Sequence, residues 1–188
     1  MSLGVVPAAG AAERFGSEKL LARVGDRPLI ERTVRSLLDG GVDRVVVVLA
    51  PGADELRGVL DHIGRVGIAV NRDRDRGMLS SIQAGLREDR GGDPILVLPG
   101  DMPYVVPATV SALLARHAED GAIVSPRFRG KRGHPVVIPA RLRDEILEAG
   151  GGDTLHDVLR RHASERADVE VEDRGVVRDV DEPGDLAP

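Results

Sequence analysis

The sequence contains no cysteine, only three aromatic residues and no long hydrophobic run. Without cysteine, disulfides and redox chemistry at sulfur are excluded, and a chain of 188 residues can bury a core without such cross-links. Two phenylalanines and one tyrosine are too few for the stacking surface of a protein that binds single-stranded nucleic acid. The longest strongly apolar run, Val45–Ala50, is far shorter than the roughly 20 residues of a membrane-spanning helix. We therefore expect no nucleic acid and no membrane among the partners.

Lysine is also scarce, since 24 of the 26 basic side chains are arginine. The net charge of −5 leaves no overall positive field, so an anionic ligand would need a local site. A compact ammonium is chemically distinct from a planar guanidinium. The two lysines, Lys19 and Lys131, are therefore candidate anion ligands, although a general bias toward arginine explains the ratio equally well. The first ten residues have no signal-peptide pattern, and we expect a cytoplasmic protein.

Short β-branched runs alternate with longer amphipathic stretches along the chain. The expected strands are Gly4–Ala8, Arg44–Ala50, Gly67–Val70, Pro94–Pro99, Ala122–Ser125, Pro135–Ile138 and Val176–Val180. The expected helices are Leu29–Leu38, Leu79–Arg87, Pro107–His117, Arg141–Glu148 and Thr154–His162. This alternation predicts one α/β domain over residues 1–188, with three layers, a mostly parallel sheet and a doubly wound, Rossmann-like topology. Ligands of such folds bind at the carboxyl ends of the strands.

The first expected strand leads into AAGAAERFGSEK, from Ala8 to Lys19. Small residues let backbone N–H groups approach an anion closely, and Arg14 and Lys19 would add two positive charges. The glycine spacing matches neither the Walker A loop nor the G-x-G-x-x-G fingerprint of dinucleotide-binding folds. These residues alone fit either an anion site or an ordinary glycine turn with solvated charges.

This segment resembles the signature loop of the nucleotidyltransferase superfamily, LAAG-x-S-x-R-M-G-x-x-K, and is most similar to that of the molybdenum cofactor cytidylyltransferases. The resemblance implies that Arg14 and Lys19 neutralise a nucleoside triphosphate. The residues that would lie against the nucleotide are Ala8, Ala9 and Gly10. Ala9 stands where guanylyl relatives usually carry glycine, which favours CTP over GTP. Pro7 and Phe15 depart from the usual pattern, and the PAAG sequence also resembles methylerythritol-phosphate cytidylyltransferases.

A second motif follows the third expected strand, in NRDRDRGMLSSIQAGL from Asn71 to Leu86. Gly77 and two serines place N–H groups and hydroxyls at the start of a helix. On these residues alone, a serine cap on a core helix is the simpler interpretation. The segment resembles the family motif N…GM-x-x-SL-x-AGL, which implies that Ser81 contacts the base or ribose and that Asn71 lies close by.

A third motif, LPGDMP, ends the fourth expected strand with Asp101 on a turn between glycine and proline. One carboxylate held in this way suits Mg²⁺, which usually binds one or two carboxylates together with substrate phosphates. An aspartate that caps the next helix is the alternative. GDMP matches the cofactor family residue for residue, which implies that Gly100 and Asp101 bind the nucleotide and its metal.

Two further motifs lie near the C-terminus. Gly133-His134-Pro135 matches a family motif beside the acceptor pocket, and we interpret Gly133 and His134 as pocket residues rather than as an acid or base. The basic loop before it, Arg127–Arg132, either meets an anionic pterin or is solvated. The ending RDVDEPGDL resembles the family's D-I-D-T-P-E-D-L. On a strand, Asp179 and Asp181 would share one face, so both are metal candidates, with Asp181 the stronger.

Taken together, the resemblance implies Mg²⁺-dependent transfer of CMP from CTP to a molybdopterin-type cofactor, with release of pyrophosphate. Its catalytic residues would be Arg14, Lys19 and Asp101. A phosphate nucleophile needs no general base, so catalysis would rest on positioning and charge neutralisation. Two alternatives stay open. The acceptor could be another small phosphate, such as a sugar phosphate or methylerythritol phosphate, or the chain could be a non-catalytic maturation factor that binds nucleotide or cofactor for a molybdoenzyme.

Overall fold

The computed structural model describes residues 1–10, 16–150, 152–181 and 183–186. Its strands are β1 (Leu3–Pro7), β2 (Arg23–Val24), β3 (Arg27–Pro28), β4 (Arg44–Leu49), β5 (Val66–Val70), β6 (Ile95–Val97), β7 (Ile123–Phe128), β8 (Lys131–Arg132), β9 (Val136–Ile138) and β10 (Arg166–Glu170). Its α-helices are α1 (Gly16–Leu21), α2 (Leu29–Asp39), α3 (Asp54–Leu60), α4 (Met78–Glu88), α5 (Pro107–Asp120), α6 (Arg143–Glu148) and α7 (Leu155–Arg161). Its 3₁₀ helices are η1 (Arg74–Arg76), η2 (Ala140–Leu142), η3 (Ala163–Glu165), η4 (Arg174–Val177) and η5 (Pro183–Leu186).

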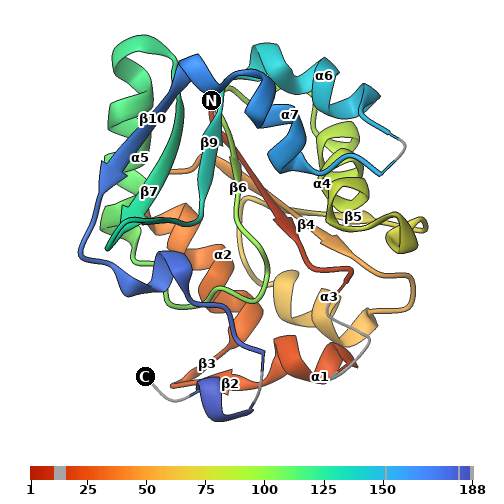
Figure 1. Ribbon diagram of the computed structural model, residues 1–188. Coiled ribbons are helices and arrows are strands. Elements are labelled where there is room, and N and C mark those ends of the chain that lie inside the picture. Colours follow the sequence, from red (N-terminus) through yellow and green to blue (C-terminus); the bar gives the residue numbers. More distant parts are fainter. Residues whose placement is uncertain (11–15, 151, 182, 187–188) are drawn as a thin grey trace.

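The main sheet has the strand order β10-β7-β9-β6-β1-β4-β5, with β8 paired to β7 (Figure 1). Strand β9 runs antiparallel to β6 and β7, and β8 is antiparallel to β7, whereas the other pairs are parallel. The mostly parallel, doubly wound sheet is therefore confirmed. From β1 the chain moves outward to β4 and β5, then returns to place β6 on the other side of β1. The carboxyl ends of β1 and β6 thus form the switch point at which such folds bind ligands.

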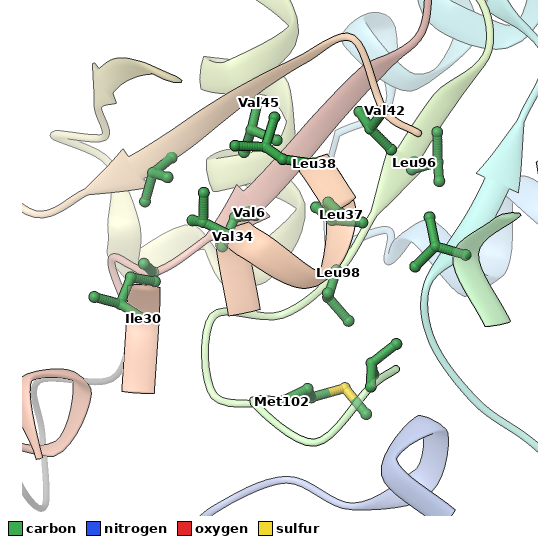
Figure 2. Close-up of a cluster of buried hydrophobic side chains, with 14 of the residues drawn as sticks. Val6, Ile30, Val34, Leu37, Leu38, Val42, Val45, Leu96, Leu98 and Met102 are labelled. Carbon is green, nitrogen blue, oxygen red and sulfur yellow. The ribbon is translucent and has the colours of Figure 1, made fainter. Parts of the chain in front are cut away.

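Apolar side chains pack on both faces of the sheet, as the three-layer prediction requires. Figure 2 shows the cluster on one face, where Val34 and Leu37 of α2 meet Val6 of β1 and Leu96 of β6. The other face packs against α4, α6 and α7 through a second cluster that includes Ile82 and Ile146. Apolar residues recur along α2 every three or four positions, so one side of this helix is buried completely against the sheet.

The expected strand over Val176–Val180 is wrong, because this segment contains η4 and then irregular backbone. Val176 and Val180 are buried and Val177 is half-buried, but the backbone of the segment makes isolated hydrogen bonds and does not pair with a neighbouring strand. The Val176 carbonyl accepts from the His134 N–H at 2.8 Å, and the Val180 N–H donates to the Asp101 carbonyl at 2.9 Å. The outer strand next to β7 is β10, which the sequence analysis did not predict. Helices α1 and α3 and the β2–β3 hairpin were also not predicted.

Candidate functional site

The switch point brings the backbones of two loops into contact. Gly100 donates its N–H to the Pro7 carbonyl at 2.9 Å, so the loop after β6 continues the pairing with β1. A Cβ on Gly100 would lie 3.1 Å from the Ala8 Cβ and 3.2 Å from the Pro7 oxygen. Buried Thr33 of α2 donates its hydroxyl to the Gly100 carbonyl at 3.1 Å. A side chain at position 100 would therefore push these neighbours apart by a few tenths of an ångström, and the close packing fixes where the next residue, Asp101, begins.

Lys19, Asp101 and Asp181 meet at this point. The Lys19 Nζ lies 3.3 Å from Asp101 Oδ2 and 3.3 Å from Asp181 Oδ1. The lysine side chain is only 10% exposed, whereas the two carboxylates are 26% and 72% exposed. Two carboxylates held this close would repel each other, and the ammonium between them offsets that repulsion. The structure thus brings together two aspartates that the sequence analysis named as metal candidates, and the role of Lys19 toward a triphosphate stays a prediction.

Asp181 reaches the site on the C-terminal segment, which returns along the carboxyl edge of the sheet toward α1 (Figure 1). The segment is fixed on one side by the hydrogen bond from Val180 N to the Asp101 carbonyl. On the other side, the Asp181 N–H donates to Asp185 Oδ2 at 3.0 Å. These contacts span the position of Asp181, so the carboxylate is held in place although most of it faces solvent.

Tyr104 and Arg178 also hold this segment, and the sequence analysis missed both. The Tyr104 hydroxyl donates to the Asp185 carbonyl at 2.8 Å, and Arg178 Nη2 donates to the same oxygen at 3.0 Å. The Arg178 guanidinium carbon lies 4.1 Å from the centre of the Tyr104 ring, within cation–π distance. One signal was available, because Tyr104 is the only tyrosine and directly follows GDMP.

Asp179 does not share this arrangement. The expectation that it shares a strand face with Asp181 fails, because no strand forms there. Asp179 is exposed, and within the described ranges no hydrogen bond or ion pair joins it to Lys19 or Asp101. The local structure thus separates two aspartates that the sequence pattern treats alike.

A second, neutral cluster follows β5. Asn71 is buried and its Nδ2 donates to Ser80 Oγ at 2.8 Å and to Ser81 Oγ at 2.9 Å. Its Oδ1 accepts from the Asp73 N–H at 2.9 Å. Both serines are also buried, and Ser80 Oγ donates to the Gly77 carbonyl at 2.7 Å. Asn71 therefore fastens the start of α4 to the end of β5. The sequence analysis gave Asn71 and Ser81 a role against the nucleotide, and their amide and hydroxyls are already engaged inside the protein.

His134 and Gly133 lie at the same edge as Asp101 because β9 runs antiparallel to β6. The start of β9 therefore meets the end of β6, and His134 Nδ1 lies 3.4 Å from the Val97 carbonyl. Burial lowers the pKa of His134 from its usual 6.5, while the Val97 carbonyl and the negative Asp101 oppose that shift. A Cβ on Gly133 would lie 2.0 Å from the Val176 oxygen, so this glycine allows the C-terminal segment to pack closely.

Some predicted nucleotide ligands are described only in part. Arg14 lies outside the described residues, so its predicted role stays a prediction. Ala8 and Ala9 are buried directly after β1, and Gly10 is exposed. The backbone of the loop thus leaves the sheet at the switch point, beside Asp101.

The sequence of this chain matches the model of the MobA-like NTP transferase domain over residues 4–167. The chain belongs to this family. A curated relative is nicotine blue oxidoreductase of Paenarthrobacter nicotinovorans, 34% identical over 187 residues, which cover 95% of this chain and 91% of the relative. A solved nucleotidyl transferase from Methanothermobacter is 28% identical with a TM-score of 0.76, covering 99% of this chain and 90% of that one.

A second similar structure supports the fold of this MobA-like NTP transferase domain. It is the homologue of Mycobacterium tuberculosis Rv0371c from Mycobacterium sp. strain JC1, with a TM-score of 0.80 and 24% identity, covering 98% of this chain and 92% of that one. The match extends past the end of the domain model and includes the C-terminal segment that carries Asp181. Within the described part of the chain, no helix is long and apolar enough to cross a membrane.

The acidic part of the site offers few protein ligands for a metal. Across residues 1–10, 16–150, 152–181 and 183–186, no group of three or more histidine, aspartate or glutamate side chains is placed to hold a metal ion. Asp101 and Asp181 converge on a single cation, the Lys19 ammonium, which shows that the pair accepts positive charge. Mg²⁺ commonly binds with one or two carboxylates and takes its other ligands from water and substrate phosphates. The residues present fit that mode of binding.

Proposed function

We propose that this MobA-like protein transfers CMP from CTP to the phosphate of a molybdopterin-type cofactor and releases pyrophosphate, with Mg²⁺ as the metal. The observation that carries the proposal is the convergence of Lys19, Asp101 and Asp181 at the switch point of the sheet. A nucleoside triphosphate brings several negative charges, and this position offers an ammonium together with carboxylates that suit a divalent cation. The family match supports an NTP as the donor.

The chain's own residues would act by position and charge. Lys19 would leave one or both carboxylates and pair with the triphosphate, where its charge stabilises the electrons that the leaving pyrophosphate gains. Asp101 and Asp181 would hold Mg²⁺, which supplies positive charge to the phosphate oxygens when it is bound. An oxygen of the acceptor phosphate forms the new bond to the α-phosphorus, while the bond from that phosphorus to the pyrophosphate oxygen breaks.

No side chain needs to remove a proton in this reaction, because a phosphate oxygen is already a nucleophile. His134 fits this scheme as a neutral group, since its burial lowers its pKa below 6.5. A neutral imidazole beside Asp101 can donate or accept one hydrogen bond without adding charge to the metal site. We therefore assign His134 to the wall of the acceptor pocket and not to proton transfer.

The choice of CTP rests on the loop after β1. The resemblance supports this choice, because Ala9 stands where guanylyl relatives usually carry glycine. A cytosine presents less bulk than a guanine to this loop. CTP should therefore be turned over faster than GTP.

The test is pyrophosphate release with each of the four NTPs and Mg²⁺, with and without molybdopterin. We expect release only with molybdopterin present and fastest with CTP. Turnover that is equal or faster with GTP would refute the cytidylyl assignment and retain the transferase. Release only with a sugar phosphate or methylerythritol phosphate would replace the acceptor. Binding of CTP without pyrophosphate release under any condition would favour the maturation factor for a molybdoenzyme.

A second candidate activity follows from the 34% identity to nicotine blue oxidoreductase. The chain has no cysteine, so the electrons for such a reduction would have to come from a bound or added carrier and not from protein thiols. Loss of nicotine blue absorbance with reduced nicotinamide nucleotides would support this activity. Asp101→Asn separates the two candidates, because it should abolish pyrophosphate release and leave a metal-independent reduction intact.

A further inference from the structure

Three arginines gather on one face of the sheet, on strands β7, β8 and β10. Arg127 in β7 lies opposite Arg132 in antiparallel β8, and Arg166 stands on β10 at the other side of β7. Side chains alternate along a strand, and the neighbouring Val124 and Val169 point to the opposite face, into the cluster that contains core residues of α5. Figure 1 shows α5 beside β7 and β10. We call Arg127, Arg132 and Arg166, with the acidic residue they share, the arginine platform.

The platform has more positive charge than its acidic side chain neutralises. Asp168 in β10 lies 3.4 Å from Arg127 Nη1 and 2.6 Å from Arg132 Nε. Glu170 is farther away, 3.7 Å from Arg127 Nε, and is 71% exposed. Arg166 donates to the Ser125 hydroxyl at 3.4 Å, and within the described ranges no ion pair joins it to a carboxylate. Asp168 thus pairs with Arg127 and Arg132, and Glu170 pairs more loosely with Arg127, so three guanidinium groups stand against two carboxylates in a protein whose net charge is −5.

Without a further anion, this arrangement of arginines destabilises the folded protein. Like charges directly opposite each other on paired strands destabilise a sheet, and Arg127 faces Arg132 in this way. Burial lowers the pKa of Arg166, and the positive charge of Arg132 lowers it further. The Nε atoms of Arg127 and Arg166 are buried and have no hydrogen-bond partner in the described structure. At the same time, the side chains of Arg127 and Arg132 are 42% and 49% exposed, so a ligand can reach them.

The platform is next to the site of the proposed reaction. Arg132 precedes His134 by two residues, which is about 7 Å of extended chain. His134 Nδ1 contacts the Val97 carbonyl at the end of β6, whose loop carries Asp101. A small molecule whose phosphate reacts beside Asp101 can thus extend past His134 toward Arg132.

We propose that Arg127, Arg132 and Arg166 bind an anionic group of the acceptor, separate from the phosphate that reacts. The proposal rests on the transfer reaction proposed above. A phosphate or another group with two acceptor oxygens fits the planar guanidinium, which donates two parallel hydrogen bonds. The arginines then gain hydrogen bonds that Asp168 alone does not supply. Lys131, although basic, is not part of the platform, because it lies beside Arg132 on a strand and points to the other face.

The first test measures anion binding without any reaction. Inorganic phosphate is titrated at constant ionic strength into ¹⁵N-labelled protein, and the Nε–H signals of the arginines are followed by NMR. We expect saturable shifts at Arg127 and Arg166, and their loss in Arg132→Gln. Arg116→Gln is the matched control, since Arg116 pairs with Asp120 in α5, away from the platform. Shifts that never saturate, or that are equal at Arg116, would show only general screening and would overturn the proposal.

The second test compares the effect of each substitution on the KM for the acceptor with its effect on the KM for CTP. Arg132→Gln and Arg166→Gln should each raise the KM for the acceptor about ten- to a hundredfold, the range expected for one lost hydrogen bond to a charged group. The KM for CTP and kcat should stay within about twofold, as should all constants of Arg116→Gln. An unchanged KM for the acceptor in active variants would refute the platform. A wild-type protein without transfer activity would instead refute the proposed function, and the phosphate titration would still decide whether the platform binds an anion.

Discussion

The neutral cluster at Asn71 and the charged cluster at Lys19 occupy the same edge of the sheet but are built in opposite ways. Asn71, Ser80 and Ser81 are buried, and they make hydrogen bonds with one another and with nearby backbone. Asp101 and Asp181 keep 26% and 72% of their side chains exposed around one ammonium. Groups in the first cluster already have their partners inside the protein. Those in the second can exchange a partner for a ligand.

Because of this difference, substitutions in the neutral cluster should mainly change stability, and substitutions in the charged cluster should mainly change activity. Replacing a buried polar group leaves its former partners without hydrogen bonds and destabilises the fold. Replacing a charge in an accessible ion pair has little effect on folding, because water and salt already screen it. We therefore expect the aspartate variants of the charged cluster to lose activity while folding normally, and variants of the neutral cluster to lose stability first.

The largest effect is expected for Asp101→Asn. The change keeps the shape of the side chain and removes its charge, so the site would lose its more buried carboxylate. Activity should fall to background, whereas the thermal midpoint should change little and CTP should still bind without metal. Pyrophosphate release, calorimetric titration with CTP and thermal unfolding measure these three properties. A variant with half of the wild-type activity would contradict the assignment.

Lys19→Ala comes next. A single preorganised donor at developing charge contributes about 2.7–4 kcal/mol, so the rate should fall about 10²–10³-fold. Lys19→Arg should recover only part of this loss, because a planar guanidinium does not replace a point charge. Steady-state kinetics at saturating CTP and acceptor provide the measurement. Near-normal turnover of Lys19→Ala would mean that the lysine serves only as the counter-ion of the two aspartates.

The two C-terminal aspartates provide a matched pair. Asp181→Asn should lower activity less than Asp101→Asn does, because Asp181 is mostly exposed and its position is more easily filled by water. Asp179→Asn should stay near wild type, because Asp179 has no contact with the cluster within the described ranges. Activity at several Mg²⁺ concentrations distinguishes them, and only Asp181→Asn should require more metal. Equal effects of the two substitutions would show that Asp179 and Asp181 have the same role, although only Asp181 contacts Lys19 in the structure.

The sequence analysis located residues in short local motifs better than residues that act through partners far away in the sequence. Residues such as Asp101 lie in short motifs directly after buried strands, where local pattern and fold agree. Residues such as Arg166 and Tyr104 act through partners 41 and 81 positions away, Ser125 and Asp185, and no local pattern encodes such pairs. The strand expected over Val176–Val180 failed for the same reason. Buried valines are equally compatible with a strand and with isolated contacts to distant backbone.

Asn71→Ala tests the neutral cluster. Loss of the amide removes the hydrogen bonds that Asn71 makes with the Ser81 hydroxyl and the Asp73 N–H, while Ser80 keeps its bond to the Gly77 carbonyl, so the free energy of unfolding should fall by about 1–3 kcal/mol. Denaturant unfolding measures this value, and activity at low temperature should fall less than that of Lys19→Ala. A stable but inactive Asn71→Ala would place this residue with the charged cluster, as a direct nucleotide ligand.

The smallest effect concerns His134, which lies near the charged cluster but is buried like the neutral one. Its pKa is lowered by burial, so the unfolded chain binds a proton at a higher pH than the folded chain does. The contribution of His134 to stability is therefore complete above the usual pKa of 6.5 and is lost as the pH drops below it.

His162 should behave in the opposite way, because Glu165 and Glu145 raise its pKa and the folded state binds the proton first. Its contribution is complete below 6.5 and is lost as the pH rises through the folded pKa. The free energies of unfolding of His134→Gln and His162→Gln, each subtracted from the wild-type value between about pH 5 and pH 8, should therefore slope in opposite directions. Parallel slopes would show that His134 keeps its proton in the folded protein, and a charged imidazole would then stand beside the proposed metal site.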